Sequence, residues 1–251
     1  MDAIAVKLER LKREARKEWK RKWRHKLRQA APANAAEWRA LALATLGGLA
    51  KIALIIALPF GVLVRGSVFI YEHGEAPVWV ALLTAAFLTG GVITAYAVWL
   101  ARKFTRAGGR RGRALIMPVA KWVALPLVVF YCSYSLLYLA SVNAKSPPVR
   151  AYYRSVHPLL RLALSTLILV DRDMLITDTG RQPEDYTKMG IPTNTRTRHY
   201  KQPDGWIHAV DLRTSGRGWI KNRGVQFYFW LMGFDTRRHV GTADHLHVEL
   251  N

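Results

Sequence analysis

Residues 78–101, "VWVALLTAAFLTGGVITAYAVWLA", contain no charged side chain. The run is longer than the roughly 20 apolar residues that a helix needs to cross the hydrocarbon core of a bilayer. Trp79 and Trp99 lie near its two ends, where aromatic side chains gather at the membrane interfaces. The stretch therefore predicts a transmembrane helix and sets the fold class of the first half of the chain.

Two further apolar runs lie on either side of this stretch. The run 41–64 reads "LALATLGGLAKIALIIALPFGVLV", and the run 114–142 contains "VALPLVVFYCSYSLLYLASV". Each run is long enough for one membrane crossing. Each also holds a lysine, Lys51 or Lys121, which either snorkels towards the cytoplasm, marks a span that starts a few residues later, or has a function inside the membrane. We predict three transmembrane helices within residues 39–142.

The distribution of charge orients these helices. The chain carries 38 Lys and Arg residues against 17 Asp and Glu residues, for a formal net charge of +21. The loop 102–113, "RKFTRAGGRRGR", is basic and contains no acid, whereas the loop 65–77 holds one arginine and two glutamates. Because basic loops stay in the cytoplasm, three spans place the chain beyond residue 143 outside. We therefore expect a bacterial inner (cytoplasmic) membrane protein whose C-terminal domain is periplasmic or extracellular.

Residues 1–38 are also basic, and they lack the apolar core of a cleavable signal peptide. Apolar side chains recur in this segment at helical spacing: Ile4, Leu8, Leu11, Ala15, Trp19, Trp23 and Leu27. The pattern predicts a cytoplasmic amphipathic helix that lies on an anionic lipid surface, with a solvated juxtamembrane helix as the alternative. Nucleic acid is not an expected partner, because the topology accounts for most of the positive charge and no recognition motif accompanies it.

The composition changes after the third apolar run. Residues 143–150, "NAKSPPVR", hold two prolines and no apolar periodicity, so we interpret them as a linker to a domain of residues 151–251. In that domain "HPLLRLALSTLILVDRD" predicts an apolar helix, although a short fourth span is an alternative. Strand patterns occur in "MLITDTGR", "WIHAVDLRT" and "HLHVEL", and "VQFYFWLMGF" fits either a helix or a buried strand. The pattern predicts a small α+β domain.

Potential metal ligands are frequent in this domain. They are His157, His199, His208, His239, His245 and His247, together with Asp204, Asp211 and Asp244. A catalytic zinc site takes three such side chains and leaves one position open. In "GTADHLHVELN", residues 241–251, strand alternation sends His245 and His247 to the same face. Residue types alone do not choose the ligands.

The order of the segments is more specific. "RHYKQPDGWIHAVDLR", residues 198–213, followed by "DHLHVEL" resembles the zinc D-Ala-D-Ala carboxypeptidase and endopeptidase family, which shares its core with lysostaphin-type peptidases and the hedgehog signalling domain. The resemblance covers residues 157–251 and implies a zinc-peptidase-like fold with an antiparallel sheet. It implies Zn²⁺ as the cofactor, with His199, Asp211 and His247 as ligands.

This chain also departs from the family pattern. The segment "YKQPDGW" lengthens the separation between His199 and Asp211, which suggests an inserted turn. His208 is therefore an alternative ligand to His199. Residues three apart on a strand face opposite sides, which favours His199 as the partner of Asp211.

Further roles are carried over from the family by position. The general base is Asp244 or His245, and Arg181 in "TDTGR" would bind substrate or stabilise the oxyanion. Asp178 is a helper or a turn residue. His157, which precedes a proline at a helix start, has no expected catalytic role. His239 is expected to be exposed in a loop, with a place beside the zinc ligands as the alternative.

Together these features favour a membrane-anchored zinc metallopeptidase that cleaves peptidoglycan peptides as a carboxypeptidase or an endopeptidase. The alternative is a non-catalytic, zinc-containing membrane protein that binds cell-wall peptides or a protein partner.

Overall fold

The computed structural model describes residues 10, 12–14, 16–23, 34–105, 114, 116–188, 190, 192, 197–241 and 244–251. It divides the chain into two compact units, residues 1–55 and 56–251. Residues 16–23 of the first unit are helical, as the amphipathic pattern predicts. The remaining positions of that pattern, and most of the basic loop 102–113, lie outside the described residues.

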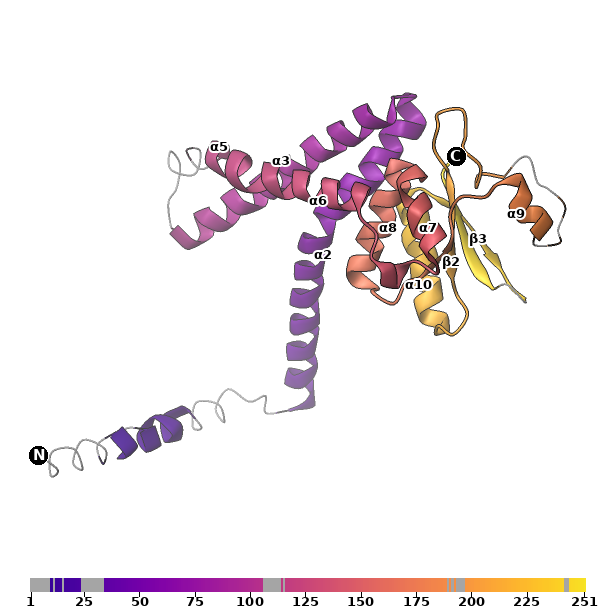
Figure 1. Cartoon of the computed structure of the whole chain (residues 1–251). Helices are drawn as coiled ribbons and strands as arrows, with labels where there is room; N and C mark the ends of the chain where they lie inside the picture. Colours follow the sequence, from indigo (N-terminus) through magenta and orange to yellow (C-terminus); the bar gives the residue numbers. More distant parts are fainter. Residues whose placement is uncertain are drawn as a thin grey trace, which may run out of the picture. The chain divides into compact units, whose positions relative to one another are not determined.

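Three long apolar helices form most of the first half of the chain (Figure 1). They are α2 (Ala35–Gly74), α3 (Val78–Thr105) and a third helix built from α5 (Ile116–Val119), the π-helical turn η1 (Ala120–Ala124) and α6 (Leu125–Leu137). The candidate spans within them are Ala35–Gly74, Val78–Leu100 and Met117–Leu137. The prediction of three helices long and apolar enough to cross a membrane is therefore confirmed.

The π turn η1 directly precedes α6, whose second residue is Pro126. Proline has no N–H to donate to the preceding turn, so an α-helix cannot continue through it with its normal bonds. A π turn shifts the hydrogen-bonding pattern at this point and lets the third helix continue.

Helix α8 (Pro158–Val170) lies at the centre of the second unit, and its residues 158–167 are all buried. A helix that is apolar on every side is stable when protein surrounds it. Here the surrounding residues include Leu63 and Val64 of α2 and Leu82 of α3. The apolar composition of α8 thus reflects burial in a protein core, and its 13 residues are short for a membrane crossing.

Polar contacts also join α8 to the third apolar helix. The Tyr131 hydroxyl lies 2.6 Å from the Thr166 hydroxyl of α8, and Tyr153, in the turn before α8, donates its hydroxyl to the Ser135 carbonyl over 2.9 Å. Arg161 donates to the Leu136 carbonyl. The C-terminal parts of α2 and of the third helix, and the N-terminal part of α3, therefore share one core with the C-terminal domain.

The predicted linker 143–150 is folded. It passes from a 3₁₀ turn (Ser141–Asn143) into α7 (Pro147–Tyr152), which is followed by a second 3₁₀ turn (Tyr153–Ser155). The Asn143 amide is buried and donates to the carbonyls of Arg172 and Met174 over 2.9 and 2.8 Å. The segment therefore holds the domain against the third helix.

The sheet has four antiparallel strands in the order β1-β2-β4-β3, which confirms the predicted antiparallel sheet. The strands are β1 (Ile176–Asp178), β2 (Ala209–Arg213), β3 (Asp235–His239) and β4 (His245–Glu249). The short helix α9 (Pro183–Lys188) follows β1, and α10 (Trp219–Met232) follows β2. The ambiguous run 225–234 is thus mainly helix, ended by Gly233 at φ 97° in the left-handed region.

Candidate metal centre

Asp211 and His247 are partners on the neighbouring strands β2 and β4. His199 lies in the turn 198–200, and its Nε2 atom reaches the same point. The Asp211 Oδ1 atom lies 3.3 Å from His199 Nε2 and 2.8 Å from His247 Nδ1, and the two ring nitrogens are 3.3 Å apart. Ligand atoms around a tetrahedral zinc ion lie about 3.3 Å from one another, given bonds of about 2.0–2.1 Å. The triangle therefore fits one zinc ion.

The opposite nitrogen of each ring is held by an acceptor. His199 Nδ1 lies 2.7 Å from the Thr179 carbonyl, and His247 Nε2 lies 3.2 Å from the Glu249 carboxylate. Because those oxygens only accept, each of these nitrogens carries the ring proton in the neutral histidine. The lone pairs of His199 Nε2 and His247 Nδ1 therefore converge on a carboxylate oxygen, an arrangement that a cation stabilises. Metal-binding histidines are oriented in this way.

Asp211 remains ionised in this environment. Its side chain is 4% exposed, and burial by itself would raise its pKa. Its contacts with the imidazoles of His199 and His247 outweigh burial and hold the pKa of Asp211 well below its usual range. The carboxylate is thus available as a charged ligand.

Arg181 contacts Asp211 from the side opposite the histidines. Its Nη2 atom donates to Asp211 Oδ2 over 2.8 Å, and its Nε donates to Asp178. Burial disfavours the charged guanidinium, but Asp178 and Asp211 raise the pKa of Arg181 overall. The two predicted residues Arg181 and Asp178 therefore lie beside the candidate ligand group, where Arg181 contacts Asp211 and is itself held by Asp178.

The two candidates for the general base lie in different environments. His245 Nε2 is 3.7 Å from Asp211 Oδ1, beside the ligand triangle. Asp244 instead binds Arg238 through both carboxylate oxygens, at 3.1 and 2.9 Å, and this ion pair lowers the pKa of Asp244. A carboxylate held in its ionised form by an arginine is a weak proton acceptor. The geometry favours His245 as the base.

Sequence reasoning missed Thr179 and Glu249, and it placed His239 near the site only as an alternative. His239 on β3 is the cross-strand partner of His245, and the two rings stack with centroids 4.7 Å apart. Burial and the neighbouring His245 lower the pKa of His239. Glu249 and Thr179 hold the outer nitrogens of the ligand histidines. The alternation of His245, His247 and Glu249 was the one sequence signal that pointed to Glu249.

A second group of possible ligands is formed by His157, Asp204 and His208. His208 Nε2 lies 2.8 Å from Asp204 Oδ2, and His157 Nε2 lies 4.0 Å from the same oxygen. The His157 Nδ1 atom accepts the Leu159 N–H at the start of α8. Its Nε2 therefore carries the ring proton and faces the carboxylate, but at 4.0 Å it is too far for a hydrogen bond and has no partner among the described residues. His208 Nδ1 is also buried without a partner there, so the hydrogen bond between His208 and Asp204 satisfies this group only in part.

A cavity of about 520 Å³ opens beside the ligand group. Its lining includes Asp178 and Thr179, which contact Arg181 and His199, and also Glu184 and Lys188 of α9. The lining does not include His199, Asp211 or His247.

The chain matches no known protein-family model, and no curated protein or solved structure matches it significantly. The resemblance to the zinc carboxypeptidases therefore rests on the residues quoted above, and the geometry of the ligand triangle is independent support for a metal site.

Proposed function

We propose that this protein is a membrane-anchored zinc peptidase that hydrolyses peptide bonds in the stems or cross-bridges of peptidoglycan. The observation that carries the proposal is the convergence of His199 Nε2, Asp211 Oδ1 and His247 Nδ1 within 3.3 Å of one another. The three donors are those of a catalytic zinc site with an open fourth position.

A zinc ion held there would activate a water molecule and polarise the scissile carbonyl. The chain's own groups supply the remaining functions. His245, 24% exposed and beside Asp211, is placed to accept a proton and then pass it to the leaving amine. Arg181 keeps Asp211 in place, and Thr179 and Glu249 orient the two histidines.

The membrane part of the proposal is supported by the three helices long and apolar enough to cross a bilayer. The basic loop 102–113 and the basic N-terminus favour the cytoplasm, which directs the C-terminal domain to the side of the cell wall. Peptidoglycan, whose glycan strands are cross-linked through their stem peptides, is the peptide-containing polymer on that side of the membrane.

One observation favours the alternative of a non-catalytic, zinc-containing protein that binds cell-wall peptides or a protein partner. The family usually has a glutamate where this chain has Asp244, and here Asp244 is bound to Arg238 instead of facing the ligand group. If His245 does not act as the base, the site would retain zinc without hydrolysis.

The test uses the full chain purified in detergent, because the domain shares its core with the long helices. Metal analysis is expected to find zinc that His247→Ala removes, and mass spectrometry of defined muropeptides is expected to find new peptide termini. Protein without zinc would refute the site. Zinc without cleavage would favour the binding protein. Protection of the C-terminal domain from protease added outside spheroplasts would refute the topology.

A further inference from the structure

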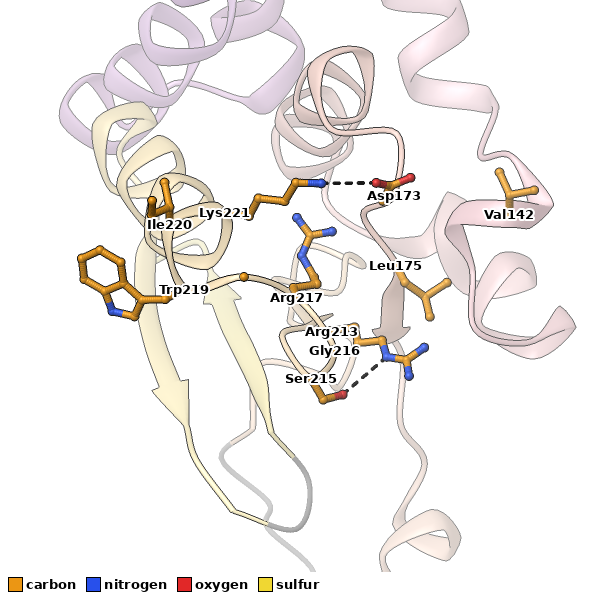
Figure 2. Close-up of a pocket in the computed structure, with 11 residues that line it drawn as sticks. Val142, Asp173, Leu175, Arg213, Ser215, Gly216, Arg217, Trp219, Ile220 and Lys221 are labelled. Carbon is orange, nitrogen blue, oxygen red and sulfur yellow. Dashed lines mark hydrogen bonds and ion pairs between the residues drawn. The ribbon is translucent and has the colours of Figure 1, made fainter.

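A cavity of about 950 Å³ lies between the start of α10, the loop 213–218 and the segment before β1 (Figure 2). None of His199, Asp211 and His247 lines it. Three cationic side chains line it instead: Arg213, Arg217 and Lys221. The cavity therefore has the lining expected for a negatively charged ligand and is distinct from the metal centre.

Arg217 is the strongest sign of a ligand. Its side chain is only 8% exposed, and one of its Nη atoms pairs with Asp171. Its Nε and other Nη atoms are buried and have no hydrogen-bond partner in the described part of the chain. Buried donors are rarely left unsatisfied, because the loss of their hydration is not compensated. In Figure 2 the guanidinium lies just beneath the ion pair of Lys221 and Asp173.

The N-terminus of α10 faces the same cavity through Gly218 and Lys221. Gly218 is the N-cap residue and provides no side-chain cap, so the N–H groups of the first turn lack that partner. The first turn contains no acidic residue and carries Lys221, which is unfavourable beside the positive end of a helix dipole. An anion at this point would satisfy both the helix terminus and the lysine.

The nearby acids do not neutralise the cluster. Asp173 is 80% exposed and lies 3.3 Å from Lys221, which is a weak surface pair that a stronger anion can replace. Asp171 occupies only one nitrogen of Arg217. Arg213 has a long contact of 3.4 Å to the Ser215 hydroxyl. Three cations against two carboxylates leave the cavity positive.

Exposed apolar side chains surround this positive cavity. Val142, Trp219 and Ile220 all line it and are 76%, 71% and 78% exposed. Val142 follows shortly after the candidate span Met117–Leu137. Cations beside exposed aromatic and aliphatic side chains at the end of a membrane helix suit a molecule with a phosphate head and an apolar tail.

We propose that this cavity binds the phosphate group of an anionic membrane lipid, with Trp219 and Ile220 against its acyl chains. Arg217, Lys221 and the first turn of α10 hold the phosphate oxygens. The inference rests on the membrane location in the proposed function, but on neither zinc nor peptidase activity.

The test measures binding to the full chain in neutral detergent at low ionic strength, with inorganic phosphate and dihexanoyl phosphatidylglycerol as separate probes. Both probes are expected to bind, the lipid more tightly, and both to weaken as salt is added. Lys221→Gln and Arg217→Gln are each expected to lower affinity about tenfold or more, because each removes a charge-assisted hydrogen bond. Arg223→Gln is the matched control, because Arg223 is on the same helix and pairs with Gln226 outside the cavity lining.

Trp219→Ala separates the two sources of phosphate, since it is expected to weaken lipid binding and leave inorganic phosphate unchanged. Equal affinity for the two probes would overturn the assignment to a lipid. Absence of binding, or wild-type affinity in Lys221→Gln, would overturn the site itself. Because Lys221 is 59% exposed, this variant does not depend on whether Arg217→Gln folds. Zinc content and muropeptide cleavage of Lys221→Gln are expected to equal those of the wild type, so a failed peptidase assay has no bearing on this result.

Discussion

Asp211 and His247 face each other across β2 and β4, and the Oδ1 and Nδ1 atoms of these two residues lie 2.8 Å apart. The pairing follows from strand register, because a shift of one residue would turn His247 towards the buried face with Leu246 and Val248. The apolar face of the sheet therefore fixes the geometry of the proposed metal centre. His199 is brought to the same point by a turn instead of a strand.

Glu249→Gln is expected to weaken zinc binding about 10- to 100-fold while leaving the fold intact, because Glu249 orients the outer nitrogen of His247. The measurement is a competition titration with a zinc chelator on the full chain. Asp235→Asn is the matched control, because Asp235 is the cross-strand partner of Glu249 and binds Asn251 instead of a ligand histidine. Equal affinity in Glu249→Gln and wild type would show that Glu249 has no such role.

Much of this site was predictable from the sequence, because its ligands belong to segments with a recognisable order. Strand alternation places His245, His247 and Glu249 on one face, and the resemblance added His199 and Asp211. Strand β3, "DTRRH", was not predictable, because it lacks the apolar alternation that reveals a half-buried strand. It is a charged edge strand, and its cross-strand pairing is what brings His239 to His245.

The packing of the long helices against the C-terminal domain was also not predictable from the sequence. Hydropathy marks Leu63, Val64 and Val68 as apolar, but it does not distinguish side chains that face lipid from those packed against protein. In the structure these three residues are buried with α8. The prolines of residues 143–150 likewise indicated a linker, whereas Pro147 is the first residue of α7.

His245→Gln is expected to lower the rate of muropeptide cleavage by about 10²- to 10⁴-fold with unchanged zinc content, because it removes the proposed base without removing a ligand. Asp244→Asn is expected to have a smaller effect, because Asp244 pairs with Arg238. The comparison requires kcat and the zinc content of each variant. A larger loss in Asp244→Asn than in His245→Gln would reverse the two assignments.

The stability of the protein is expected to fall as the pH decreases from about 6.5 to 3. Burial, together with neighbouring His208, lowers the pKa of His157 to about 3 in the folded protein. In the unfolded chain His157 binds a proton near its ordinary pKa. Unfolding therefore takes up a proton in this range and becomes more favourable as the pH falls. His157→Asn, which keeps a side chain able to cap α8, is expected to flatten the dependence in chemical denaturation between pH 7 and 4. An unchanged slope would contradict the buried neutral state.

A fragment of residues 145–251 is expected to aggregate or to unfold, although it contains every proposed metal ligand. It lacks Leu63, Val64 and Leu82, which cover α8, and the Ser135 and Leu136 carbonyls that accept from Tyr153 and Arg161. The fragment contains no other segment to cover this part of α8, so the apolar side chains of α8 would be exposed to water. Light scattering and circular dichroism on the fragment, with the full chain in detergent as the control, measure this directly. A monomeric, cooperatively folded fragment would show that the shared core is dispensable and that the domain is independent of the long helices.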